Sequence, residues 1–117
     1  MEISGTWENQ NGSVLTIGPV EDGSFEGTFV STKGRAAQGR AYPVRGVANG
    51  ELLAFSVDFR DGDDNLHSIC SFSGRLRDGV LHTVWVVARE FEDAEQTKPT
   101  EPWNTFLTNA DYFERRD

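Results

Sequence analysis

A chain of 117 residues has the length of one small domain, and we expect residues 1–117 to form a single unit with its own core. Its 37% hydrophobic and 26% charged residues argue against disorder, and the formal net charge of −8 argues against nucleic acid and anionic membranes as partners. A single cysteine excludes an internal disulfide and a zinc site built from several cysteines.

The sequence begins Met1-Glu2-Ile3-Ser4, without the basic stretch and apolar run of an export signal. No apolar run further along has the length of a membrane span. We therefore expect neither an export signal nor a membrane segment in this sequence.

Pairs of Asn-Gly or Asp-Gly separate segments that are rich in Val, Phe, Thr and Trp. These pairs are Asn11-Gly12, Asp22-Gly23, Asn49-Gly50 and Asp78-Gly79. Such pairs supply the positive φ angles that tight β-hairpin turns require. Asp61-Gly62 opens a further polar break, which we expect to end at Asn65.

The segments between the turns predict strands joined by hairpins. We expect strands at 5–10, 13–19, 24–31, 41–48, 51–60, 66–77, 80–90 and 103–114, and loops at 32–40 and 92–102. Since each strand follows its neighbour through a hairpin, they form an antiparallel meander, which has exposed edges unless it closes. The sequence therefore predicts an all-β fold, an eight-stranded antiparallel up-and-down β-barrel, with room for one small ligand.

Alternation along the strands predicts the side chains that face the interior. One face of 51–60 carries Leu53, Phe55, Val57 and Phe59, one face of 66–76 carries Ser68, Cys70, Phe72 and Gly74, and one face of 24–31 carries Phe25, Gly27, Phe29 and Ser31. Aromatic rings mixed with small hydroxyls are typical of a binding cavity. The alternative is that these serines bond to nearby backbone.

The segment 80–90 is apolar on both faces. Leu81, Trp85 and Val87 share one face, and Val84, Val86 and Ala88 share the other. An apolar outer face indicates a subunit interface, unless the acidic loop of the same chain covers it.

No group of residues carries a strong catalytic or metal-binding signal. His67 and Cys70 are three residues apart, so on a strand they point to opposite faces, and His82 lies on an outer face. The run from Asp61 begins like a calcium loop, but Leu66 and Phe72 stand where Gly and Glu are required. We therefore predict neither an enzyme nor a metal site.

Several segments occur together in an order that is informative. They are Gly5–Ser13, Asp22–Phe29, Tyr42–Gly46 with Ala54–Phe59, Asn65–Gly74, Thr83–Val87 and Trp103–Phe113. In this order they resemble the avidin/streptavidin family, especially its short bacterial members, over nearly the whole chain. The resemblance implies a streptavidin-like barrel that binds biotin without catalysis or cofactor, in a pocket at one end.

The resemblance also implies roles for polar residues. Asn9 and Ser13 match donors to the ureido oxygen of biotin, and Ser31 and Asp111 match acceptors for its two N–H groups. Ser68 matches a hydroxyl near the valerate carboxylate. The loop 32–40 does not align, and we consider Lys33 or Arg35 as partners of that carboxylate.

The aromatic walls match with departures. Trp85, Phe72 and Phe59 match the walls, although Phe59 replaces a usual tryptophan. Phe29 stands where the family usually has a tyrosine that donates to the ureido oxygen, and Cys70 stands where a threonine usually contacts the sulfur of biotin.

Trp103 matches a tryptophan that a neighbouring subunit lends in tetrameric members. The resemblance therefore favours a homotetramer over a dimer. Members are commonly exported, so the resemblance also suggests a secreted or periplasmic protein, although this sequence shows no export signal and leaves the compartment open.

Three other functions remain open at this stage. One is a lipocalin-like carrier of a different hydrophobic ligand, and another is an avidin-like barrel whose changed walls select a different ligand. The third is a small-barrel enzyme, which requires an inward acid or base in addition to Asp111.

Overall fold

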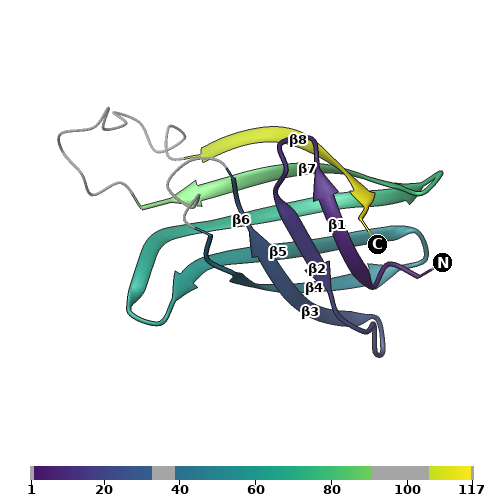
Figure 1. Ribbon diagram of the computed structural model, residues 1–117, viewed down its shortest axis with the longest axis horizontal. Coiled ribbons are helices and arrows are strands. Elements are labelled where there is room, and N and C mark those ends of the chain that lie inside the picture. The colour runs from purple at the N-terminus through teal and green to yellow at the C-terminus, as the bar shows by residue number, and fades with distance from the viewer. Residues whose placement is uncertain (1, 33–38, 91–105, 117) are drawn as a thin grey trace.

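The structure is a computed structural model that describes residues 2–32, 39–90 and 106–116. Within these residues, antiparallel strands close into one barrel in which each strand pairs with the next and β1 pairs with β8 (Figure 1). The strands are β1 (Gly5–Asn9), β2 (Val14–Ile17), β3 (Ser24–Val30), β4 (Tyr42–Asn49), β5 (Leu52–Asp61), β6 (Asp64–Arg77), β7 (Val80–Arg89) and β8 (Phe106–Arg115). The predicted all-β up-and-down barrel is confirmed.

The turn pairs adopt two conformations. In Asp22-Gly23 and Asp78-Gly79 both residues have positive φ, with 53° and 78° in the first pair and 54° and 79° in the second. This is the backbone of a type I′ turn, whose twist matches that of the flanking strands. At the two Asn-Gly pairs only the glycine has positive φ.

The polar break after Asp61 is shorter than we expected. β5 continues to Asp61 and β6 begins at Asp64, so the turn is confined to Gly62 and Asp63. Arg40 lies beside this hairpin, 3.1 Å from an oxygen of Asp61 and 3.0 Å from one of Asp64. These ion pairs and the turn at Gly62 keep Asp61 and Asp64 paired between β5 and β6. From composition alone, both residues were expected in a loop.

Most other strand boundaries agree with the expected ones within a few residues. β2 ends at Ile17 rather than at residue 19. The start of the expected strand 103–114, the loop 92–102 and most of the loop 32–40 lie outside the described residues. Within the described part of the chain, no helix is long and apolar enough to cross a membrane.

The interior is packed at one end of the barrel. Trp7, Leu15, Leu76, Leu81 and Phe113 are at most 2% exposed, and they come from strands β1, β2, β6, β7 and β8. The inward faces of β5 and β6 agree with the alternation, since Leu53, Phe55, Val57, Phe59, Cys70 and Phe72 are all buried. A filled end holds the strands in register, which leaves the other end able to form a cavity.

Candidate ligand-binding site

A partly open cavity of about 440 Å³ lies within the barrel, toward the end where β7 stops. It is lined by ten of the eleven residues expected in the site: Asn9, Ser13, Phe29, Ser31, Phe59, Ser68, Cys70, Phe72, Trp85 and Asp111. The eleventh, Trp103, lies outside the described residues, as do Lys33 and Arg35. These side chains come from six strands, β1, β3 and β5 to β8, and from the segments that follow β1 and β3.

Asn9 and Asp111 form the buried polar centre of the cavity wall. Each is 8% exposed, and Asn9 Nδ2 donates a hydrogen bond of 3.0 Å to Asp111 Oδ2. The side-chain oxygen of Asn9 accepts from the backbone N–H groups of Asn11 and Ser13, at 3.0 and 2.8 Å. Since an amide nitrogen carries two hydrogens, Asn9 retains a second donor for a ligand.

A further residue, Gln10, holds the second oxygen of Asp111. Gln10 Nε2 donates to Asp111 Oδ1 at 2.9 Å, and Gln10 Oε1 accepts from the backbone N–H of Tyr112 at 3.1 Å. This role was not expected, because Gln10 directly precedes the predicted Asn11-Gly12 turn, and the structure shows its side chain to be exposed. The carboxylate therefore has a defined orientation in the absence of a ligand.

Ser13 is tied to the segment that follows β3. Its Oγ accepts from the backbone N–H of Thr32 at 3.0 Å and lies 3.1 Å from Thr32 Oγ1. Thr32 Oγ1 in turn donates to the carbonyl oxygen of Asn11 at 2.7 Å. This network fixes the β1–β2 turn against the end of β3 and places Ser13 at the cavity surface.

The aromatic part of the wall continues into the core. Phe72 stacks on Phe55 with ring centroids 4.5 Å apart, and it also lies 6.0 Å from Phe29 and 6.2 Å from Phe113. Such pairs contribute about 0.5–1.5 kcal/mol beyond the area they bury. The wall is therefore held by the same contacts that stabilise the barrel.

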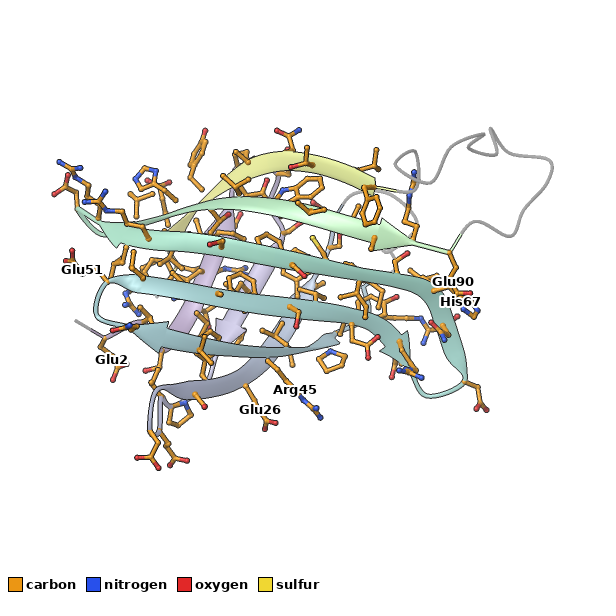
Figure 2. The ribbon with its side chains drawn as sticks, turned by 180° about the vertical axis from the view of Figure 1, so that it is seen from behind. Glu2, Glu26, Arg45, Glu51, His67 and Glu90 are labelled. Atoms are coloured by element: carbon orange, nitrogen blue, oxygen red, sulfur yellow. The ribbon has the colours of Figure 1, made fainter. Side chains whose placement is uncertain are left out.

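Cys70 faces the cavity beside these rings. Burial, reinforced by the negative charge of Asp111, raises the pKa of Cys70 from 9.0 to about 12. The thiol is therefore protonated at neutral pH and is a poor nucleophile. His67 lies on the outer face, with Nδ1 3.8 Å from Glu90 Oε1, and Figure 2 shows these two residues together, near the beginning of β6 and just after the end of β7.

Five lining residues were not among those expected: Asn11, Leu66, Val87, Arg89 and Leu107. For three of them, the alternation of side chains along the strand predicts an inward position. Val87 and Arg89 follow Trp85 at steps of two on β7, and Leu107 precedes Asp111 by four on β8. Among the described residues, no group of His, Cys, Asp and Glu side chains is arranged to hold a metal ion.

The model of the avidin family matches residues 1–116 of this sequence. The chain belongs to the avidin family. Members of this family are non-catalytic binding proteins, which confirms the expectation of a binding protein rather than an enzyme. The family resemblance drawn from the ordered segments is likewise confirmed.

Individual relatives agree with this membership. The chain is 32% identical to afifavidin of Afifella pfennigii over 73 residues, which are 62% of this chain and 46% of that relative. The rhizavidin–biotin complex has 26% identity and a TM-score of 0.81, and the match covers 99% of this chain and 93% of that one. A shwanavidin variant in complex with biotin has 26% identity and a TM-score of 0.79, with 99% of each chain covered.

Proposed function

We propose that this protein binds biotin without catalysis in the barrel cavity, with the ureido ring held by Asn9, Ser13, Ser31 and Asp111. The observation that carries the proposal is that these four residues border one cavity together with aromatic side chains. The biotin complexes of rhizavidin and the shwanavidin variant, which share the fold, support the same ligand.

The chemistry of a cyclic urea matches the polar groups of the wall. Its oxygen requires donors, and its two N–H groups require acceptors, because unpaired polar atoms in a dry cavity cost about 1–3 kcal/mol each. Asn9 offers its second amide hydrogen, and Ser13 offers its hydroxyl hydrogen when this turns from Thr32 Oγ1 toward the ligand. Ser31 and Asp111 offer acceptors. A carboxylate that accepts from a urea N–H draws charge toward the urea oxygen and strengthens the opposite hydrogen bonds.

We further propose that the chain forms a homo-oligomer through the outer face of β6, β7 and β8. This face carries large apolar side chains that are 42–57% exposed: Ile69, Val84, Val86, Phe106 and Tyr112. The register brings Ile69 and Phe106 to either side of Ala88, so the apolar surface is continuous across the strands. A tetramer is favoured over a dimer because Trp103 matches the tryptophan lent between subunits in tetrameric members.

Calorimetric titration with biotin and thermal unfolding with and without biotin test the binding proposal. We expect heat and thermal stabilisation from biotin but not from a fatty-acid probe. Asp111→Asn removes the charged acceptor, and we expect it to weaken binding roughly ten- to a hundredfold.

Asp63→Asn provides the matched control, because Asp63 lies in the exposed β5–β6 turn. We expect this variant to bind as the unchanged protein does. No heat and no stabilisation from biotin would contradict the proposed function, and stabilisation by the fatty-acid probe instead would favour a lipocalin-like carrier.

A further inference from the structure

The charges of the cavity lie at two positions. Among the described side chains that line it, Asp111 and Arg89 are the charged ones, since Cys70 retains its proton. Asp111 is 8% exposed and is held by Asn9 and Gln10. Arg89 is the last residue of β7 and is half-buried. The cavity thus has one buried negative group and one positive group nearer to solvent.

These two charges are separated along the barrel. Asp111 is the partner of Thr83 on β7, and Arg89 follows Thr83 by six residues on the same inward face. At about 3.3 Å per residue, six residues span roughly 20 Å along the strand. Both side chains line the same cavity, so a ligand that extends along the cavity can contact both charged groups.

Arg89 also lies beside Ser68, which the family resemblance matches to a hydroxyl near the carboxylate of the ligand. In the ladder between β6 and β7, Arg89 is the direct partner of Ser68, and both line the cavity. A guanidinium presents five N–H donors in a planar fork that matches a carboxylate, so contact with one neighbour leaves donors for another. In a chain of net charge −8, a local cation offsets the negative potential of the protein and favours the binding of an anionic group.

We propose that Arg89, with Ser68 beside it, forms the subsite for the carboxylate of the ligand. The cavity then selects molecules that carry a urea-like head at the Asp111 end and an anionic tail at the Arg89 end. This inference rests on the proposed biotin binding. It assigns the tail to a strand residue rather than to Lys33 or Arg35, which we considered from the sequence.

The test compares biotin with its methyl ester, which has the same head and an uncharged tail. Dissociation constants for both ligands are measured by competition with unchanged protein, Arg89→Gln, Arg89→Lys and Arg60→Gln. Arg60→Gln is the matched control, because Arg60 borders an adjacent hollow on the outer face that Arg89 also borders, but it does not line the cavity. Thermal unfolding verifies that each variant is folded.

We expect the unchanged protein to prefer the acid, and Arg89→Gln to reduce the acid-to-ester preference about tenfold with little change for the ester. Arg89→Lys should retain part of the preference, and Arg60→Gln all of it. An unchanged preference in Arg89→Gln, or equal weakening of both ligands, would overturn the carboxylate subsite while leaving biotin binding intact. Failure of the unchanged protein to bind either ligand would overturn the proposed function and this inference together.

Discussion

At the scale of single residues, the polar centre of the cavity is ordered before a ligand arrives. Asn9 and Gln10 each hold one oxygen of Asp111, at 3.0 and 2.9 Å. Fixing a side chain in its binding orientation lowers the entropy lost on association, because that ordering has already occurred during folding. We therefore attribute to Gln10 a positioning role, which differs from direct contact with the ligand.

The wall residues that differ from the usual family pattern affect the affinity for the ligand. Phe29 lines the cavity with its ring 6.0 Å from Phe72, and it has no hydroxyl to donate to a ureido oxygen. Asn9 and Ser13 are then the matched donors that remain for that oxygen. Loss of one such hydrogen bond weakens binding by about 1–3 kcal/mol, so we expect tight binding that falls below the strongest in the family.

Ionisation of Cys70 makes the stability of the barrel depend on pH in the alkaline range. Its pKa is raised by burial and by Asp111 from 9.0 to about 12, so the folded chain holds the proton more tightly than the unfolded chain does. The stabilising contribution is fully present below pH 9 and is lost as the pH rises toward 12. We expect the free energy of unfolding to fall in this range by up to about 1.4 kcal/mol per pH unit more than in Cys70→Ala.

Denaturant unfolding of both proteins at several pH values between 8 and 11 measures this difference. The comparison is needed because tyrosine and lysine residues titrate in the same range. Parallel pH profiles for the two proteins would contradict the assignment to Cys70.

Residue-level prediction from the sequence succeeded where strand alternation placed the side chain in the interior. Phe59, Cys70 and Phe72 are buried as the alternation requires. Gln10 escaped prediction because its role depends on a side-chain conformation that reaches across to β8. Arg89 was not considered in the sequence analysis, although it follows Val87 by two residues and its position in the alternation is therefore inward.

At the scale of elements, the turns explain why two of the hairpins were predicted correctly and why the hairpin at Asp61 was not. Asp22-Gly23 and Asp78-Gly79 have positive φ at both positions, and they define their hairpins as expected. The hairpin at Asp61 was misjudged because a run of acidic residues is typical of a loop. Asp61 and Asp64 instead form ion pairs with Arg40, which is distant in sequence. Local composition could not predict this interaction.

Gly27 shows how closely β2 and β3 approach each other. A Cβ atom at this position would collide with the carbonyl oxygen of Thr16 on β2, which cannot move without distorting the ladder. We expect Gly27→Ala to lower the free energy of unfolding by about 1–3 kcal/mol, as measured by chemical denaturation. Thr28→Ala is the control, because Thr28 is exposed on the same strand. Equal stability of the two variants would show that the strands can separate without cost.

At the scale of the whole molecule, the barrel divides structural and binding roles between its ends. The packed end contains Leu15, Leu76 and Leu81, each at most 2% exposed, whereas the cavity occupies the other part of the interior. Closure was predictable, because a meander of hairpins leaves unpaired edges and pairing β1 with β8 removes them. For the proposed assembly of copies, the pattern along the strands predicts only an apolar outer face, since no single strand specifies a symmetry or a number of subunits.

The apolar outer face gives the last prediction. Val84 lies on this face of β7 and is 57% exposed, between Ser73 of β6 and Ala110 of β8. If the face joins two copies, Val84→Asp places an unpaired carboxylate in an apolar interface, which costs several kcal/mol. We expect light scattering to show an oligomer for the unchanged protein and a smaller species for Val84→Asp.

Val47→Asp is the control for that experiment, because Val47 on β4 is 56% exposed, nearly as much as Val84. Val47 pairs with β3 and β5, outside the proposed contact, so the mass of this variant should equal that of the unchanged protein. If Trp103 completes a neighbouring cavity, Val84→Asp should also weaken biotin binding, because separating the copies removes the lent side chain. A monomeric unchanged protein, or a Val84→Asp variant of unchanged mass, would contradict the interface; loss of assembly with full affinity would contradict the role of Trp103 alone.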